Sequence, residues 1–400
     1  MSTELPWSIP SGFRAAATRA GIKPSGGLDL VVLESVRPCS AAGTFTTNRI
    51  CAAPVKWDRQ HLPSERVRAI VINAGNANAA TGEQGEANVA RTARLAAGRL
   101  GCRDEEVLIA STGVIGHQLP MDRLEAGLGT ALGLLSAESS SFEEASRAIL
   151  TTDTRAKVIS KVARIGDRDI RVFAMAKGAA MIGPRMATML GFFLTDANVN
   201  SNDLQAILAE AVDHSFNCIS VEGHTSTNDT VLLLANGAAE GKPLEGESLR
   251  LFAALIHESC DELARMIPDD GEGATHLITI DVEGCADREQ ARSIARAVAD
   301  SALVKTAIHG ADPNWGRIVS AAGYSGVSFE ESQCSLWLNG TALYLDGTPL
   351  NFDASAVSNR LKSERDVSIR LVFTLGQAAI RFWTCDLTAE YIRLNADYTT

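Results

Sequence analysis

The spacing of apolar residues along the chain predicts short buried strands that alternate with longer amphipathic helices. Apolar runs of four to six residues, which are typical of buried strands, occur at 69–72, 107–110, 171–176 and 230–234. Apolar residues recur at helical spacing over about 83–100, 203–216 and 247–266. This alternation favours an α/β protein.

Two capping boxes sharpen these helix predictions. Ser141 has Glu144 three residues later, which predicts a helix that begins at this serine and runs to about residue 150. Asp287 has Gln290 at the same spacing and predicts a second helix start. The loops NAGNANAATG and STGVIG are expected directly after the strands at 69–72 and 107–110.

A glycine-rich stretch at 269–276 is the clearest candidate boundary between two units. After it, an alternating strand is expected at 277–282, followed by the helix from Asp287. Further strands are expected at 367–374 and 378–383, and a short polar tail ends the chain. Hairpin turns are expected at Asn339-Gly340 and Asp346-Gly347.

Composition and charge narrow the class of protein. The 400 residues are 46% hydrophobic, enough for a large core and for two or three domains, or one large domain with an appendage. The net charge of −11 argues against a surface that binds nucleic acid and against a polybasic patch that binds membranes. The first residues lack a signal-peptide pattern and no apolar run is long enough to span a bilayer, so we expect a cytoplasmic protein.

The cysteines and histidines do not predict a metal centre. The eight cysteines are scattered without a CxxC pair, and free buried thiols are the expectation. The seven histidines show no metal-binding spacing, so we predict no metal. The segment NAGNANAATGEQG lacks both the P-loop and the dinucleotide fingerprint, and we interpret it as a tight loop near the active site.

The segment KGAAMIGPRMATMLGFFLTDA at 177–197 carries the most chemical information. It places one threonine, Thr188, in an apolar stretch, and composition alone favours a hydrogen-bonded core hydroxyl. The alternative is a nucleophile whose own freed α-amine acts as the base. Freeing that amine requires the hydroxyl to attack the preceding carbonyl, and the small Ala187 leaves that carbonyl uncrowded. Glycines and Pro184 would hold the loop bent.

The segment resembles the processing site of the ornithine acetyltransferase family, the self-cleaving glutamate N-acetyltransferases of arginine biosynthesis. The resemblance covers nearly the whole chain. It includes GFRAAATRAGIK, TFTTNR, INAGNANAATG, STGVIG, TTDT, TSTNDTVLLLANG, DGEGAT, LVKTAIHGADPNWGRI and CDLTAEYIRLNADYTT, in this order. It implies that the bond between Ala187 and Thr188 is cleaved, which gives an α chain of residues 1–187 and a β chain of residues 188–400.

The resemblance also implies a set of site residues. Thr112 and Gly113 in STGVIG match the family's oxyanion hole, although such a segment is also a common strand-to-helix turn. The residues that match substrate contacts are Thr151, Lys177, Thr188, Glu272, Asn395 and Thr400. The motif does not decide whether Thr151 or the adjacent Thr152 is the matching substrate contact. The lysine would meet an α-carboxylate, and Glu272 an ammonium group.

Three positions depart from the family pattern. Ala180 stands where glycine is usual, Arg185 replaces asparagine, and His224 replaces an acidic residue. None of them removes the nucleophile, the lysine or the oxyanion segment. They bear on processing rate and on substrate identity.

For the fold, the resemblance implies a layered α-β-β-α sandwich shared with a group of self-processing aminopeptidases, with a second, smaller α/β domain. We expect the main domain at residues 1–275, with the C-terminal strands in 365–400 returning to it. The smaller domain is expected at 276–364. The α and β chains are expected to stay associated, as a heterotetramer or a higher oligomer.

For function, the resemblance implies acetyl transfer from N2-acetylornithine to glutamate by a ping-pong mechanism through acetyl-Thr188, without a metal or organic cofactor. Three alternatives stay open. A bifunctional form would also take acetyl-CoA as donor, an aminopeptidase or amidase would use water as acceptor, and a silent binding protein would not cleave itself. Neither a nucleic-acid partner nor a membrane partner is expected.

Overall fold

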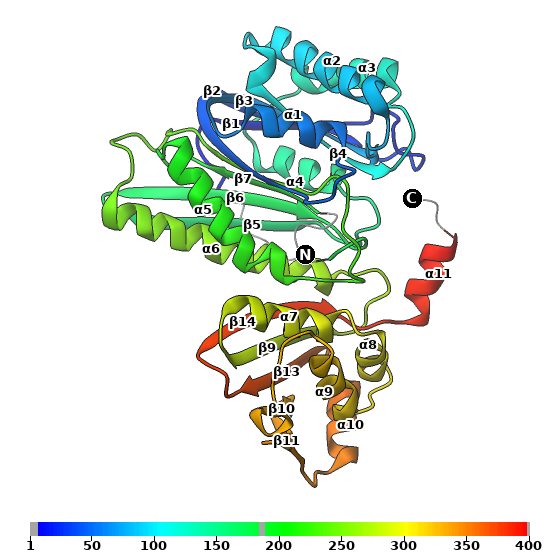
Figure 1. The fold of residues 1–400 in the computed structure, drawn as a ribbon. Helices are drawn as coiled ribbons and strands as arrows, with labels where there is room; N and C mark the ends of the chain where they lie inside the picture. The colour runs from blue at the N-terminus through cyan, green and yellow to red at the C-terminus, as the bar shows by residue number, and fades with distance from the viewer. Residues whose placement is uncertain (1–6, 184–188, 398–400) are drawn as a thin grey trace.

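The computed structural model describes residues 7–183 and 189–397, which form two units, one above the other in Figure 1, each built on one β-sheet. The strands of the first unit are β1 (Phe13–Thr18), β2 (Leu30–Phe45), β3 (Ser64–Asn76), β4 (Val107–Val114), β5 (Lys157–Ile165), β6 (Arg168–Lys177), β7 (Leu190–Thr195) and β8 (Thr230–Ala235). Its helices are α1 (Ala53–His61), α2 (Gly82–Leu100), α3 (Met121–Gly133), α4 (Ser139–Ala148), α5 (Ser201–His214) and α6 (Gly246–Asp269).

One long strand joins the two halves of the first sheet. The strand order is β4-β3-β2-β8-β7-β6-β5, and β1 also pairs with β2. The first part of β2 pairs with β1 and β3, whereas the part from Ser40 to Phe45 pairs with β8. Between these parts Val36, Arg37 and Pro38 are exposed and the register with β3 shifts. The expected two sheets are therefore one sheet that changes direction within β2.

Three hydrophobic cores show that this sheet folds into two layers. Alternate residues of a strand point to opposite faces. Val31 of β2 and Phe192 of β7 belong to a core between the two sheet layers. Val32 of β2 packs toward α2 and α3, and Phe193 of β7 packs toward α5 and α6. The layers are thus helix, sheet, sheet and helix, which confirms the predicted α-β-β-α sandwich.

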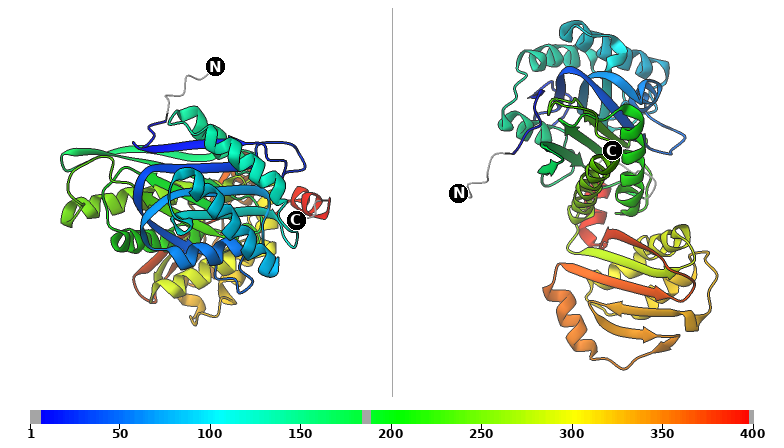
Figure 2. Two further views of the ribbon diagram at one scale, coloured as in Figure 1. Left: turned by 90° about the horizontal axis from the view of Figure 1, so that it is seen from above. Right: turned by 90° about the vertical axis from the view of Figure 1, so that its left-hand side faces the viewer.

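The second unit begins with β9 and has the sheet order β12-β11-β10-β13-β9-β14. Its strands are β9 (Leu277–Cys285), β10 (Cys334–Leu338), β11 (Thr341–Leu345), β12 (Thr348–Pro349), β13 (Asp366–Phe373) and β14 (Ala378–Cys385). Its helices are α7 (Arg288–Ala299), α8 (Ala302–His309), α9 (Trp315–Gly323) and α10 (Ala354–Ser363). Figure 2 shows these helices packed beside the smaller sheet.

The prediction that the strands in 365–400 return to the main domain is wrong. β13 pairs in parallel with β9, and β14 pairs antiparallel with the other edge of β9, so both belong to the second sheet. Ile380 and Phe382 of β14 face the core of that unit. The apolar alternation of these strands identifies a buried face, but it does not say which sheet the strands join.

The predicted strands are confirmed, whereas two predicted element boundaries are wrong. All the predicted strands and long helices are present, and Asn339 and Asp346 have the positive φ of hairpin turns. Asp287 caps α7 by accepting the amide of Gln290. However, α4 already begins at Ser139, so Ser141 lies inside it. The segment STGV of the expected loop continues β4, because it pairs with β3.

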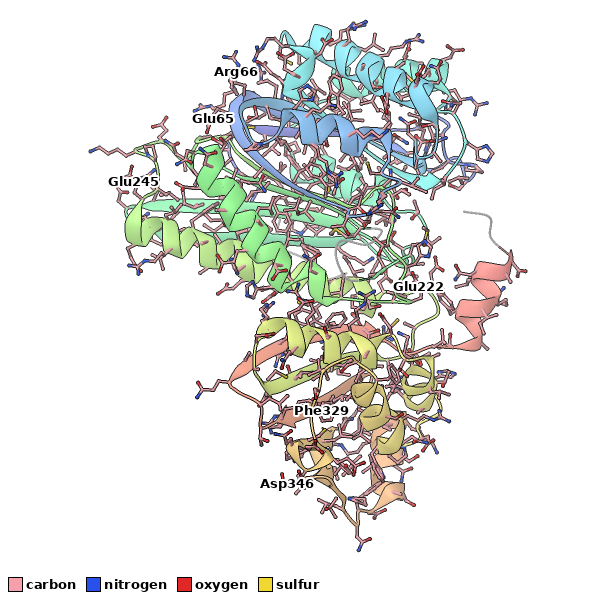
Figure 3. All side chains as sticks on the ribbon, in the orientation of Figure 1. Glu65, Arg66, Glu222, Glu245, Phe329 and Asp346 are labelled. Atoms are coloured by element: carbon pink, nitrogen blue, oxygen red, sulfur yellow. The ribbon has the colours of Figure 1, made fainter. Side chains whose placement is uncertain are left out.

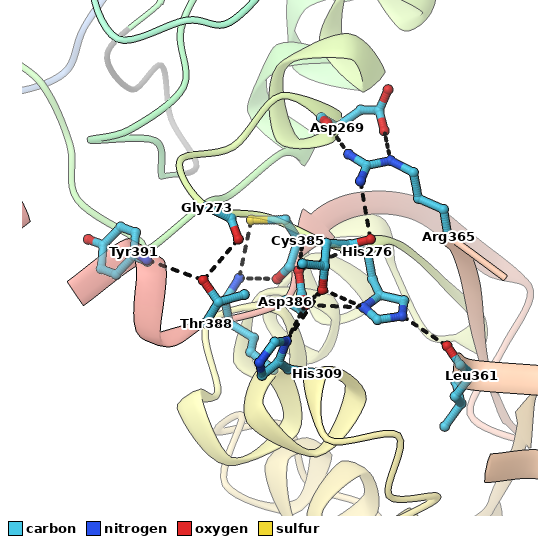
Figure 4. A network of polar contacts seen from close by, with 12 residues as sticks. Asp269, Gly273, His276, His309, Leu361, Arg365, Cys385, Asp386, Thr388 and Tyr391 are labelled. Carbon is cyan, nitrogen blue, oxygen red and sulfur yellow. Dashed lines mark hydrogen bonds and ion pairs between the residues drawn. The ribbon is translucent and has the colours of Figure 1, made fainter. Parts of the chain in front are cut away.

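The expected polar tail contains a helix, α11 (Ala389–Asp397), which buries none of its residues and returns toward the first unit (Figure 1). The junction before it is held by Asp386, which accepts the backbone amides of Thr275 at 2.8 Å and of His276 at 2.9 Å (Figure 4). Within the described residues, no helix combines the length and apolar character that a membrane span requires.

Candidate active site

A pocket of about 520 Å³, counted to its open mouth, lies where the ends of β4 and β6 meet the loops after α4 and α6 and the last helix. It gathers residues that are far apart in the sequence. The lining residues are Thr112, Gly113, Val114, Thr151, Thr152, Lys177, Ala180, Met181, Glu272 and Asn395. Every predicted site residue that the structure describes is among them. Three predicted residues, Ala187, Thr188 and Thr400, lie outside the described residues.

Thr112 and Gly113 occupy the end of β4, beside the end of its parallel neighbour β3. Gly113 has φ of +132°, a conformation that favours glycine. A Cβ atom there would lie 2.3 Å from the backbone carbon of Gly75 and 2.5 Å from the nitrogen of Asn76. The close approach of the two strands therefore requires glycine, and it leaves the backbone of this segment open to the pocket.

A buried amide network fixes this strand end. The side-chain amide of Asn228, just before β8, donates to the carbonyl oxygens of Ala77 at 2.6 Å and Ser111 at 2.8 Å. The hydroxyl of Ser111 donates to Asn73 Oδ1 at 2.6 Å. A preorganised backbone of this kind can stabilise developing negative charge without rearrangement.

Lys177 is the last residue of β6, and its ammonium group is buried in the wall of the pocket. Its Nζ donates to Thr151 Oγ1 at 2.8 Å and lies 3.8 Å from Asp153 Oδ2. Burial lowers the pKa of Lys177 from its ordinary value, while the charge of Asp153 opposes that shift. Thr151 is thus the lysine's neighbour, although Thr152 also lines the pocket.

Glu272 and Asn395 lie side by side in the lining of the pocket. Asn395 Nδ2 donates to Glu272 Oε2 at 2.8 Å, and the amide of Glu272 donates to the Ala179 carbonyl at 2.9 Å. Asn395 comes from α11, so the last helix supplies part of this wall. A carboxylate next to an amide can bind an ammonium group with two acceptor oxygens.

Hydrogen bonds hold the chain on both sides of the predicted cleavage segment. The amides of Val221 and Gly223 donate to the Ile182 carbonyl at 2.8 and 3.0 Å. On the other side, the amide of Met189 donates to Asp229 Oδ1 at 3.0 Å. Residue 189 precedes β7, whose first residue Leu190 pairs with Lys177. The backbone next to the predicted nucleophile therefore lies beside the predicted substrate lysine.

Two carboxyl groups near this segment are strongly perturbed. Asp229 is completely buried, and burial raises its pKa well above the usual range of an aspartate. Burial also raises the pKa of Glu222 to about 8, and Figure 3 shows this residue on the side of the first unit that faces α11. Burial therefore shifts both carboxyl groups toward their protonated form.

Sequence reasoning missed four residues that support the pocket: Asp153, Lys157, Asn228 and Asp229. Three of them lie inside the TTDT and TSTND segments that carry the family resemblance. A signal was present for Asn228 and Asp229, because polar residues directly beside a buried apolar strand need buried partners. Lys157 gave no such signal, since a lysine at a strand edge is usually solvated.

Among the described residues, no group of three or more histidine, cysteine, aspartate or glutamate side chains has a geometry that could hold a metal ion. His276 and His309 both lie 3.1 Å from Asp386 Oδ2, in a cluster at the start of the second unit (Figure 4). His276 Nε2 also faces the Leu361 carbonyl at 2.9 Å. Because a carbonyl only accepts, this nitrogen carries a proton and is not a metal ligand.

Comparisons with known proteins agree with the resemblance. The model of the ArgJ family matches residues 14–400. A relative from Dehalococcoides mccartyi, named arginine biosynthesis bifunctional protein ArgJ, is 47% identical over 98% of this chain and 97% of its own length. One of the same name from Thermotoga neapolitana is 44% identical over 98% of this chain and all of its own length.

One solved structure of a related protein contains a chain that matches only part of the present chain. The crystal structure of the arginine biosynthesis bifunctional protein ArgJ from Bacillus halodurans is 38% identical to this chain, with a TM-score of 0.51. The match covers 98% of that chain but 52% of this one. The solved chain therefore corresponds to about half of the present chain, whereas each of the two relatives matches 98% of the present chain.

Proposed function

The chain belongs to the ArgJ family of arginine-biosynthesis enzymes, and on that premise we propose that it cleaves itself before Thr188 and then transfers acetyl from N2-acetylornithine to glutamate. One observation carries the proposal. A single pocket gathers Thr112, Gly113, Thr151, Lys177, Glu272 and Asn395 from separate stretches of the chain. The half-length match of the Bacillus halodurans chain supports a protein that exists as two pieces.

In the self-cleavage step, the hydroxyl of Thr188 attacks the carbonyl carbon of Ala187, and the peptide C–N bond breaks. The acyl group moves to the hydroxyl oxygen as an ester, while the nitrogen takes a proton and becomes the amine of Thr188. Water then hydrolyses the ester and releases the carboxylate of Ala187. The product has a threonine whose own amine can serve as the general base.

In the transfer reaction, that amine accepts the hydroxyl proton while the oxygen attacks the acetyl carbonyl of N2-acetylornithine. The developing oxyanion is stabilised at Thr112 and Gly113, whose backbone is fixed by the contact with Gly75. The C–N bond breaks, ornithine leaves with the proton, and acetyl remains on Thr188 as an ester. The α-amine of glutamate attacks this ester, which regenerates the hydroxyl. The two half-reactions exchange one acyl group, so the proposal requires no metal or organic cofactor.

The charges in the pocket fit the first substrate. The buried ammonium of Lys177 meets the α-carboxylate, and Glu272 with Asn395 meets the side-chain ammonium of ornithine. The name of the relatives, which calls them bifunctional, favours a second donor, and we include acetyl-CoA in the proposal.

The two cleavage products are expected to stay together. β6 precedes the proposed cut and β7 follows it, yet they are neighbours in one sheet, and β8 of the second product pairs with β2 of the first. We further propose that this α/β pair forms a heterotetramer or a higher oligomer in the cytoplasm. Light scattering on the native protein would give a mass of at least twice 42.4 kDa.

The first experiment tests cleavage. On a denaturing gel, the wild-type protein is expected to run as two bands, and Thr188→Ala as one band at 42.4 kDa. Thr188→Ser keeps a hydroxyl at the same position and should still give two bands. A single inactive band for the wild type would refute the mechanism.

The second experiment follows the acetyl group. With labelled N2-acetylornithine, label is expected in N-acetylglutamate when glutamate is present. Free acetate as the sole labelled product would instead identify an amidase. Labelled acetyl-CoA, used in place of acetylornithine, decides whether the second donor is accepted.

A further inference from the structure

Four buried charged side chains form a cluster behind the wall of the pocket. Asp153 lies in the loop after α4, Lys157 on β5, Lys177 on β6, and Asp270 directly after α6. The side chains of Asp153 and Lys157 are fully buried, and those of Lys177 and Asp270 are nearly so. Two positive and two negative charges balance, as buried charges must. The proposed mechanism uses Lys177 alone.

Asp153 accepts hydrogen bonds from groups other than Lys177. Its Oδ1 accepts the Gly178 amide at 2.6 Å and Lys157 Nζ at 2.8 Å. Its Oδ2 accepts the Thr151 amide at 3.2 Å. Lys177 Nζ lies 3.8 Å from this oxygen, which is too far for a hydrogen bond but close enough for strong attraction in a buried site.

Lys177 consequently keeps donors for a ligand. An ammonium group has three N–H donors. Among the described residues, the hydroxyl of Thr151 is the acceptor that lies within hydrogen-bond distance of Nζ. Asp153 therefore attracts the lysine without occupying its donors, and its bonds to the amides of Thr151 and Gly178 fix both residues that flank the ammonium group.

Lys157 completes the arrangement from the side away from the pocket. Its Nζ lies 2.8 Å from Asp153 Oδ1 and 2.6 Å from Asp270 Oδ2. Asp270 is itself held by the amide of Thr154 at 3.1 Å and by the hydroxyl of the same residue. By binding Asp153, Lys157 limits how closely that carboxylate can approach Lys177.

We propose that Asp153 is a positioning residue, which holds the Lys177 ammonium charged and free to bind the substrate carboxylate, and that Lys157 tunes this action. The inference deepens the proposed function and rests on it, since it concerns how the same pocket binds its substrate. It assigns to Asp153 and Lys157 opposite effects on the charge of Lys177.

The opposite signs follow from the charges that face Lys177. These are Asp153 and Lys157 behind the pocket, Glu272 across it, Asp229 before β8, and Lys23 from the segment before β2. Removing the negative charge of Asp153 lowers the pKa of Lys177 further, because burial is then less opposed. Removing Lys157, a like charge, raises the pKa of Lys177.

The experiment measures KM and kcat for N2-acetylornithine from pH 6 to pH 10. A carboxylate binds well while Lys177 is charged, so KM rises as the pH passes the pKa of this lysine. Asp153→Asn is expected to move that rise down by about one pH unit, which gives an approximately tenfold higher KM at a pH within the shifted range. Lys157→Gln is expected to move the rise upward. In both variants, kcat at low pH is expected to stay within about threefold of wild type.

Lys161→Gln is the matched control. Lys161 also lies on β5 and pairs with two carboxylates, Glu258 and Glu262, but it is not part of the pocket. Its pH profile is expected to equal that of the wild type. Asp153→Glu, which restores the charge, should return the profile toward wild type.

Shifts in the same direction for Asp153→Asn and Lys157→Gln, or no shift in either folded variant, would overturn the inference. If Asp153→Asn fails to fold, Lys157→Gln decides, since an unchanged or lowered profile contradicts the proposal. Calorimetric binding of N2-acetylornithine to Thr188→Ala, with and without each substitution, repeats the pH series without cleavage or turnover. Failure of the proposed transfer therefore remains distinguishable from failure of this inference.

Discussion

Gly113 occupies a position in the pocket where no residue with a Cβ atom fits. Its φ and its contact with Gly75 both require glycine, and the segment that it forms lines the pocket. The sequence predicted the role of this residue through its motif. It could not predict the close contact with Gly75, because that contact depends on the parallel pairing of β3 with β4.

Gly113→Ala is predicted to abolish self-cleavage or to slow acetyl transfer at least a hundredfold, because the added Cβ displaces the oxyanion segment. The measurement is the rate of band conversion on a denaturing gel, together with kcat of any cleaved protein. Gly98→Ala is the control, since a Cβ at this position in α2 meets nothing within 4 Å. Equal activity of both variants would exclude the assigned role of Gly113.

Glu272→Gln is predicted to raise KM for N2-acetylornithine at least tenfold, because a neutral amide binds the ornithine ammonium more weakly than a carboxylate does. Cleavage should continue, so the gel should still show two bands. Glu262→Gln, which removes a carboxylate on α6 that pairs with Lys161, should leave KM unchanged. An unaltered KM in Glu272→Gln would mean that the ammonium binds elsewhere.

At the scale of residues, the family motifs predicted the residues that line the pocket but not the buried charged residues behind them. Thr112, Thr151 and Lys177 were predicted, and they line one cavity. The cluster of Asp153 with Lys157 was not predicted, because its partner Asp270 lies more than a hundred positions further along the chain. Such pairings arise from the fold and leave no local spacing in the sequence.

At the scale of elements, α11 is the clearest departure from expectation. From the sequence alone, this segment is expected to be a short polar tail. In the structure it buries no residue. It is attached where Thr388 Oγ1 donates to the Gly273 carbonyl at 2.9 Å and where Asn395 meets Glu272. A helix this short depends on such contacts.

Ending the chain at Thr388 is predicted to leave the fold intact and to impair substrate binding. Because α11 buries no residue, the melting temperature should change by no more than about 3 °C, within the range expected for a loss near 1 kcal/mol. KM for N2-acetylornithine should rise at least tenfold, since Asn395 is lost. Thermal melts and steady-state kinetics measure both quantities, and a truncated protein with unchanged KM would contradict the prediction.

Long strands and helix starts differ in how far they could be predicted. The near-continuous apolar residues of β8 identified it, because both faces of this strand are buried between layers, whereas the equally buried β7 was not predicted as a strand. The start of α4 was misplaced because the spacing of Ser141 and Glu144 matches a capping box inside the helix, whereas the residue that precedes the first turn is Glu138. Which residue caps the helix is decided by packing around it.

At the scale of the whole molecule, a charged cluster at the start of the second unit, next to its junction with the first, has a strength that depends on pH. His276 donates toward Asp386 at 3.1 Å, and this contact raises the pKa of the histidine above its usual value. The resulting stabilisation is fully present below the pKa of an unfolded histidine. It is lost as the pH rises through the higher pKa of the folded state.

His276→Gln is therefore predicted to be less stable than wild type by about 1–2 kcal/mol at pH 6, with a difference that shrinks toward pH 9. Chemical denaturation at several pH values measures this difference. His309→Gln is the comparison, because His309 lies at the same distance from Asp386 but is about 42% exposed, so it should have the smaller effect. A constant difference from pH 6 to pH 9 would show that His276 acts without its charge.

The position of the proposed cut between β6 and β7 has a kinetic consequence. The sheet can form while the two strands are still linked, so the uncut chain folds in a first-order process. After the cut, the same sheet would have to form from two separate molecules, and refolding becomes second order. Denaturant should thus unfold the mature protein with poor recovery at high dilution, whereas Thr188→Ala should refold at any dilution. The native state of the mature protein then depends on folding before cleavage as well as on the sequence.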